Sequence, residues 1–255
     1  MNHVSLRSTA RSEWLKFRSV RSTLYGLITM FVLSIGLGTV IDITSLHHAG
    51  DGGFIDPLTR SLFGHFFAQF VVGVVGALYI TNEYSNASIR TTLAAVPRRT
   101  LLIMSKLLVM TVTFLIVTEI LCFAMFFIGQ AIFKGQIASF GIGDPGVLRG
   151  IALAGVYLMF LGGLGFALGL LLRKTSATIV VFVVTLLVLP GLVRLLPSDW
   201  GGPIIRYLPN TLGEGMMSVN HADGTFTPWV CALILFGYIA TLIALGIYVI
   251  NNRDA

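Results

Sequence analysis

Residues 61–82, SLFGHFFAQFVVGVVGALYITN, run for 22 positions without a Lys, Arg, Asp or Glu. About 20 apolar residues in a helix are enough to cross a hydrocarbon core roughly 30 Å thick. The continuous apolar character lacks the alternation that the strands of membrane barrels show. The stretch therefore predicts one membrane-spanning helix.

The same pattern recurs along the chain. Charge-free runs cover residues 22–41, 150–172, 175–193 and 224–252, and a further run between Lys106 and Lys134 is broken only by Glu119. Of the 255 residues, 55% are hydrophobic and 11% are charged, whereas soluble domains are about 25% charged. We expect an all-α integral membrane protein with six spans in a single domain, residues 1–255, and both termini on one side.

The positive charges predict which side that is. With the N-terminus inside, twelve of the 17 Lys and Arg residues fall in cytoplasmic segments and five fall outside. Such a bias marks the cytoplasmic side in membrane proteins. The net charge of +6 thus follows from topology, so no nucleic-acid partner is expected. No cleavable signal peptide is predicted, because residues 1–21 are polar and the first apolar run is long enough to span.

No pattern in the chain predicts catalysis. It contains no H-E-x-x-H, no G-x-S-x-G and no G-x-x-x-x-G-K-[ST], the loop that cradles nucleotide phosphates. His47 and His48 lack a third ligand, and Cys122 and Cys231 lie within apolar runs, so neither a metal site nor a disulfide is predicted. We expect no enzyme activity and no cofactor in this chain. If a nucleotide drives it, another polypeptide binds that nucleotide.

The N-terminal segment, residues 4–22, predicts an amphipathic helix. At 100° per residue its apolar face would include Leu6, Ala10, Trp14, Phe17, Val20 and, just beyond, Leu24. Such a helix lies in the membrane interface, with Trp14 at headgroup depth. Leu15 stands alone on the polar face. That position favours a protein partner over a plain membrane anchor, although both readings stay open.

A second polar segment, EYSNASIRTTLAAVPRRT (residues 83–100), separates two apolar runs. Residues 84–98 can form a short helix with Ile89, Leu93 and Val96 on one side, ended by Pro97. A helix of this kind can lie along the membrane and present an apolar patch to a partner. A plain interfacial turn fits the same composition.

Several residues within the spans invite a role. An ionised Glu119 near mid-depth is costly, so it is expected to make a structural hydrogen bond or to line a substrate path. Arg194 is a candidate partner for it, or else reaches the outer headgroups. Gly165 with Gly169, and Gly73 with Ala77, predict close helix packing within one subunit or between two. Pro190 is expected to kink the fifth span.

Three motifs together resemble a known family. NEYSNASIRTTLAAVPRRT is similar to the segment between the second and third spans of ABC type-two permeases, the six-span membrane subunits of bacterial exporters. SEWLKFRSVRSTL resembles the start of the actinobacterial branch of that family, and YLPNTLGEGM resembles its segment before the last span.

The resemblance implies a partner and a set of contact residues. In such permeases the N-terminal helix and the helix between spans two and three contact an ATP-binding cassette subunit, which holds ATP and Mg²⁺. The corresponding coupling residues are Glu83, Tyr84, Ile89, Arg90, Thr91, Thr92, Leu93, Val96 and Pro97. Those of the connecting helix are Glu13, Trp14, Lys16 and Arg18.

The resemblance also implies an assembly and a place. Two permeases, identical or related, and two ATPases would form the exporter in the bacterial cell membrane. Residues 197–228 would form short helices capping the outer exit of the path. The alternative is a non-transporting membrane scaffold or an ATP-independent carrier, and the sequence does not identify a substrate.

Overall fold

Long apolar segments fold as helices in a membrane because a helix satisfies its own backbone hydrogen bonds. The computed structural model describes residues 6–19, 21–47, 57–85, 99–135, 140–219 and 225–252, and these residues form helices and no strands. The elements are α1 (Leu6–Ser19), α2 (Arg21–His47), α3 (Pro57–Ser61), α4 (His65–Ser85), α6 (Arg99–Phe133), α7 (Val147–Leu172), α8 (Thr175–Val183), the π-helical turn η2 (Val184–Val188), α9 (Leu189–Arg194), α10 (Ser198–Ile205), α11 (Pro209–Met217) and α12 (Pro228–Asn252).

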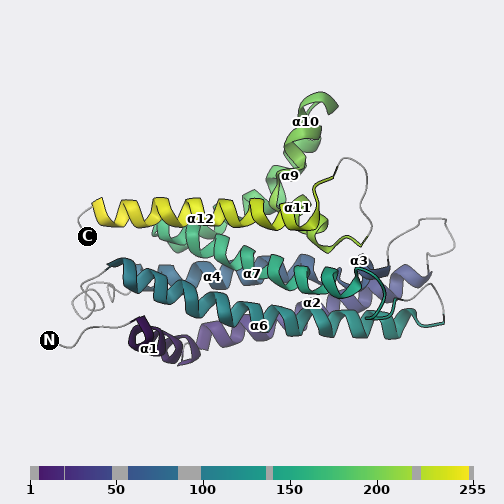
Figure 1. The fold of residues 1–255 in the computed structure, drawn as a ribbon, viewed down its shortest axis with the longest axis horizontal. Helices are drawn as coiled ribbons and strands as arrows, with labels where there is room; N and C mark the ends of the chain where they lie inside the picture. Colours follow the sequence, from purple (N-terminus) through teal and green to yellow (C-terminus); the bar gives the residue numbers. More distant parts are fainter. Residues whose placement is uncertain are drawn as a thin grey trace.

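Six segments in the described part of the chain are long and apolar enough to cross a membrane. They are Arg21–Thr44, His65–Tyr84, Thr100–Phe133, Val147–Leu172, Thr175–Arg194 and Pro228–Ile250. The predicted all-α membrane fold with six spans is confirmed. In Figure 1, α1 and the last turn of α12 lie at the same end of the bundle, as an even number of spans requires.

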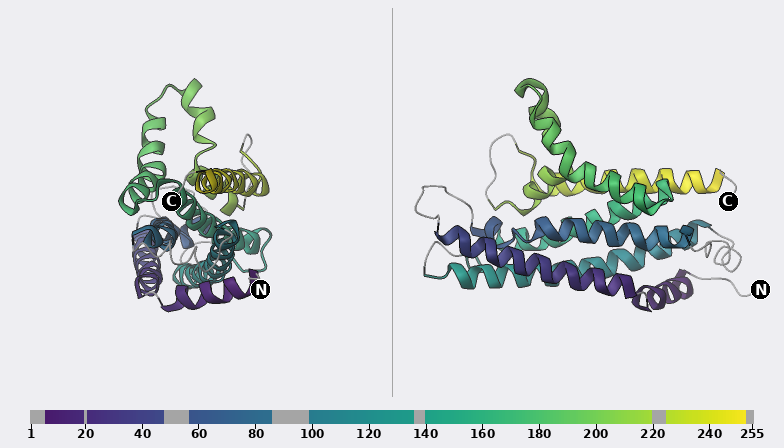
Figure 2. Two further views of the ribbon diagram at one scale, coloured as in Figure 1. Left: turned by 90° about the vertical axis from the view of Figure 1, so that its left-hand side faces the viewer. Right: turned by 180° about the vertical axis from the view of Figure 1, so that it is seen from behind.

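Helix α7 is the centre of the bundle. It is the most buried of the spans and packs against α4, α6 and α12, while α2 packs on α4 and α6. Helix α1 lies across the spans at one end of the bundle and packs on the start of α6 (Figure 2). The spans therefore form one packed body with α1 attached at one end.

Small residues set the distance between α4 and α7. A Cβ on Gly165 would lie 2.1 Å from the carbonyl oxygen of Gly73, and a Cβ on Gly76 would lie 2.2 Å from the carbonyl oxygen of Gly162. Only glycine permits backbones to approach this closely, and lipid itself supplies no hydrophobic drive for packing. The small residues predicted to pack helices thus do so here within one chain.

Replacing Gly165 with Ala tests this crossing. The added methyl group forces α7 away from α4, and we expect the free energy of unfolding to fall by about 1–3 kcal/mol. Thermal unfolding in mild detergent measures the change. Gly237→Ala on α12 is the control, because nothing lies within 4 Å of that position. Equal melting temperatures for the two variants would contradict the crossing.

The fifth span leans away from the bundle, and a π-helical turn interrupts it just before Pro190, the residue expected to kink it. It comprises α8, η2 and α9, and Figure 1 shows α9 and α10 leaning outward from the other helices. Pro190 has no N–H, so the Leu186 carbonyl four residues earlier lacks its helical donor. The side-chain amide of Asn210 on α11 donates to that carbonyl at 2.6 Å. A residue 24 positions away thus satisfies the helix at its bend.

Asn210→Leu removes that donor at the bend. We expect a loss of about 1–3 kcal/mol in stability, the usual cost of a buried polar group left without a partner. In a Pro190→Ala background the loss should shrink, because residue 190 then supplies its own N–H. A double-mutant cycle on detergent-solubilised protein measures this coupling, with Asn252→Leu at the exposed end of α12 as the control. Additive effects would show that Asn210 does not replace the missing donor.

Candidate functional site

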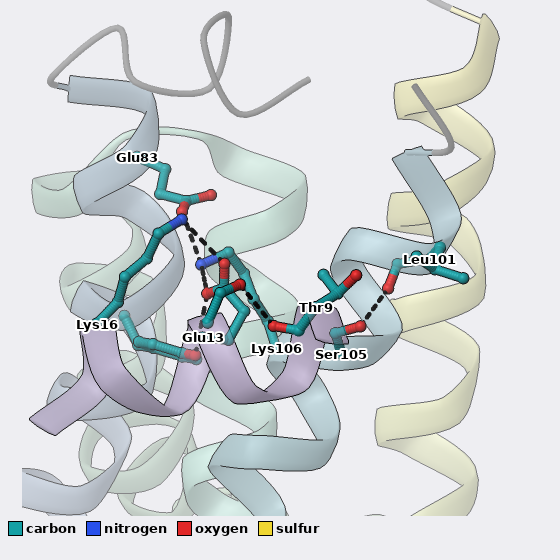
Figure 3. A network of polar contacts seen from close by, with 9 residues as sticks. Thr9, Glu13, Lys16, Glu83, Leu101, Ser105 and Lys106 are labelled. Carbon is teal, nitrogen blue, oxygen red and sulfur yellow. Dashed lines mark hydrogen bonds and ion pairs between the residues drawn. The ribbon is translucent and has the colours of Figure 1, made fainter. Parts of the chain in front are cut away.

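A buried ammonium group joins three helices at the end of the bundle where α1 lies. Lys106, two turns into α6, is 2% exposed. Its Nζ lies 2.5 Å from Oε2 of Glu13 on α1 and 2.7 Å from Oε1 of Glu83 near the end of α4. Figure 3 shows these side chains pointing toward one another. The three charges connect α1 to the end of one span and the start of the next.

Two more side chains complete this group. The Tyr79 hydroxyl donates to Oε2 of Glu13 at 3.4 Å, and the Lys106 ammonium lies 4.8 Å from the centre of the Tyr79 ring. Lys16 donates to Oε1 of Glu13 at 3.0 Å and is half exposed. We call Glu13, Lys16, Tyr79, Glu83 and Lys106 the Lys106 cluster. Its two carboxylates and two ammonium groups balance, which offsets part of the cost of burying charge.

The cluster sets the orientation of α1. Thr9, Glu13 and Phe17, spaced four residues apart, form its buried side, and the Phe17 ring packs edge-on against Tyr79 at 5.0 Å. Of the predicted apolar face, Phe17 is buried against the bundle and Trp14 is 45% exposed, so the position of Trp14 at headgroup depth stays a prediction. Glu13 is 1% exposed because its carboxylate meets the Lys106 ammonium. Helix α1 also ends at Ser19, and Leu24 belongs to α2.

On the opposite side of α1, the side chains that the structure describes are exposed. Leu15 is 61% exposed, and two residues turn a helix by about 200°, so it lies nearly opposite Glu13. Arg11 and Arg18 are exposed beside it. We call Leu15, Arg11 and Arg18 the outer face of α1. It presents one apolar side chain between two positive charges.

The predicted coupling residues fall into two groups. Ile89, Arg90, Thr91, Thr92, Leu93, Val96 and Pro97 lie outside the described residues. Glu83 and Tyr84 are described, and both face the bundle: Glu83 binds Lys106, and the Arg173 guanidinium lies 5.8 Å from the Tyr84 ring centre. These two residues hold the end of α4 in place.

The predicted path residues, Glu119 and Arg194, do not meet. The Glu119 carboxyl group packs on Gly155 of α7, where an added Cβ would lie 2.5 Å from the carboxyl carbon. Its Oε2 is buried without a hydrogen-bond partner. Arg194 instead acts on Glu214 of α11: burial raises the pKa of that carboxyl group, and the Arg194 charge partly opposes the rise. The suggested Glu119–Arg194 pair is thus not formed.

The comparison with known families assigns most of the chain. Residues 53–255 match the family described as "Protein of unknown function (DUF2705)". The chain belongs to the DUF2705 family. The matched region of this DUF2705 member contains Tyr79, Glu83 and Lys106, and it begins after α1 and α2. No curated protein matches the sequence.

Sequence patterns did not single out Lys106 or Tyr79. Lys106 counted only as one of the positive charges that predict orientation. The sequence did contain a signal for the cluster. In the predicted topology, the cytoplasmic segments of this DUF2705 member hold twelve basic residues and three acidic ones, Glu13, Glu83 and Asp254. Two rare carboxylates close to spans indicate a buried cation between them. Among the described residues, no three His, Cys, Asp or Glu side chains gather to hold a metal.

Lys106→Met tests the cluster. It leaves Glu13 and Glu83 buried without their shared cation, and breaking a buried ion pair on one side costs about 3–5 kcal/mol. We expect a large drop in melting temperature in detergent. Lys134→Met, at the exposed far end of α6, should leave it unchanged.

A triple variant separates charge from packing in the same assay. Glu13→Gln, Glu83→Gln and Lys106→Met together remove all three buried charges, and should recover much of the stability that Lys106→Met loses. A single variant as stable as the unmodified protein would show that the cluster is dispensable.

Proposed function

We propose that this chain is the membrane-spanning permease subunit of an ATP-driven ABC exporter in a bacterial cell membrane. It forms the substrate path and is driven by a separate ATP-binding cassette subunit. The observation that carries the proposal is the Lys106 cluster. It ties α1 to α4 and α6, the two helices that border residues 86–98. Helix α1 and residues 86–98 are the two parts of the chain that the family resemblance assigns to ATPase contact.

The cluster supplies a mechanical connection between those parts. A force on α1 reaches α4 through Glu83 and α6 through Lys106, because each carboxylate is bound to the same buried ammonium. Helix α6 has 35 residues and extends about 50 Å at 1.5 Å per residue. It packs on α7 in the centre of the bundle. Movement at the ATPase side would therefore be passed along α6 to the opposite end.

The outer face of α1 offers a surface for the partner. Leu15 supplies an apolar contact, and Arg11 and Arg18 favour a partner with acidic groups around an apolar pocket. The side of the bundle that carries α1 would be cytoplasmic, in line with the excess of positive charge. ATP and Mg²⁺ would bind in the partner, since this sequence has no phosphate-binding loop. A second permease, the same chain or a related one, would complete the membrane part.

Co-purification tests the proposal directly. The tagged chain, extracted from its native cells in mild detergent, should retain a cassette ATPase in a ratio near one to one. Leu15→Ser should weaken this recovery several-fold by removing an exposed contact, and joint replacement of Arg90 and Leu93 should abolish it. Quantitative mass spectrometry of the eluted proteins measures the ratio.

Leu148→Ser is the matched control, because Leu148 is an exposed leucine at the opposite end of the bundle, 53% exposed against 61% for Leu15. It should retain the ATPase fully. A chain that purifies alone from intact membranes would reject the permease role in favour of a non-transporting scaffold or an ATP-independent carrier.

A further inference from the structure

A cavity lies at the side of the helical bundle, between α7, α12 and the outward-leaning fifth span. The cavity has a volume of about 420 Å³, which lies within the usual range for small-molecule sites. Its wall comes from three spans, with Leu161 and Leu164 on α7, Leu189 on the fifth span, and Ile239 and Leu242 on α12. Tyr207, Leu208 and Pro209, where α11 begins, close one end of it. The α7 and α12 positions fall near the middle of their spans, so this part of the cavity lies at the depth of the lipid hydrocarbon.

The lining is suited to an apolar ligand. The described residues that form it carry no charge. Its threonine hydroxyls donate within their own helices, Thr185 to the Val181 carbonyl at 2.8 Å and Thr241 to the Gly237 carbonyl at 2.7 Å. The Tyr238 hydroxyl donates to the Tyr207 carbonyl at 3.2 Å. Apart from these groups and the Tyr207 hydroxyl, the side chains of the described lining are hydrocarbon, so the walls recognise a ligand mainly by packing.

The cavity is bordered by surfaces that face the bilayer. Helix α8 packs on α4 and α7, whereas η2 and α9 pack mainly on their neighbours in the sequence. Leu187 and Leu192 on the fifth span and Leu233 and Phe236 on α12 are exposed apolar side chains. A hydrocarbon chain from the surrounding lipid can therefore enter sideways between the fifth span and α12.

A hydrocarbon chain matches this space in kind. It is apolar, narrow and flexible, so it can fill an apolar cavity of this volume by packing.

We propose that the cavity between α7, α12 and the fifth span binds the hydrocarbon chain of a lipid or lipid-like amphiphile taken sideways from the bilayer. The binding itself does not depend on an ATPase. Its use as the cargo site of an exporter rests on the function proposed above. The hydroxyl–carbonyl contact between Tyr238 and Tyr207 borders the cavity, so the polar head of the ligand stays outside the apolar walls.

Photolabelling in vesicles tests the site. The purified full-length chain is placed in phosphatidylcholine vesicles containing a small fraction of phosphatidylcholine with a diazirine midway along one acyl chain. Irradiation followed by peptide mass spectrometry locates the attached lipid. We expect labels on Leu161 and Ile239, because both line the cavity and are buried from the rest of the surface.

A matched pair of tryptophan variants decides the source of those labels. Leu242→Trp fills the cavity and should reduce labelling of Leu161 and Ile239 at least tenfold. Leu233→Trp adds the same side chain on the lipid-facing side of α12 and should leave the labelling of Leu161 and Ile239 unchanged. Thermal unfolding of both variants checks that they are folded, and Thr241→Phe is a second cavity-filling variant if Leu242→Trp unfolds.

Three results would overturn the proposal. The first is an absence of label at Leu161 and Ile239. The second is equal labelling of these residues with and without the Leu242→Trp substitution. The third is efficient disulfide formation between two copies of a Leu242→Cys variant in the vesicles. The last result would show that a second copy covers the cavity. ATPase co-purification is a separate measurement. If the cavity takes no label, the permease proposal still stands on co-purification. If no ATPase co-purifies, lipid binding in the cavity is still decided by the labels.

Discussion

The hydrocarbon core of a bilayer offers no hydrogen-bond partners. Most polar groups in the interior of this protein are therefore hydrogen-bonded to other groups of the same chain. The spans satisfy their own backbones as helices. Where Pro190 removes one backbone donor, Asn210 on α11 supplies another from outside the helix. Where a lysine is buried at the end of the bundle, two carboxylates from different helices meet it. The Glu119 carboxyl oxygen is an exception among the described residues, since it is buried without a hydrogen bond.

The same requirement links the bend of the fifth span to the cavity beside it. A π-helical turn comes just before Pro190, and the Asn210 amide donates to the Leu186 carbonyl within that turn. Leu189, next to Pro190, lines the cavity. The break in helix geometry, its added tertiary contact and the apolar cavity therefore lie side by side on the fifth span.

The Lys106 cluster and the cavity lie in different parts of the molecule. The cluster lies at the end that holds α1, and it joins that helix to α4 and α6 (Figure 3). The cavity lies among α7, α12 and the fifth span. Helix α7 touches all of these elements except α1, and its tight glycine crossing with α4 makes it the stiff connection between them. In a transporter, this arrangement separates the part that receives force from the part that holds cargo.

The sequence by itself determined the six spans, their helical form and the shared side of the two ends, because span length and charge distribution are local properties of the chain. It also predicted close packing at Gly73 and Gly165, which follows from residue type, and it placed an irregularity at Pro190, just after the π-helical turn. Only the tertiary structure decided that Glu13 rather than Trp14 faces the bundle, and that Glu83 turns inward. Those outcomes depend on Lys106, which lies 93 residues from Glu13 in the chain, and helical periodicity carries no information about a partner so distant.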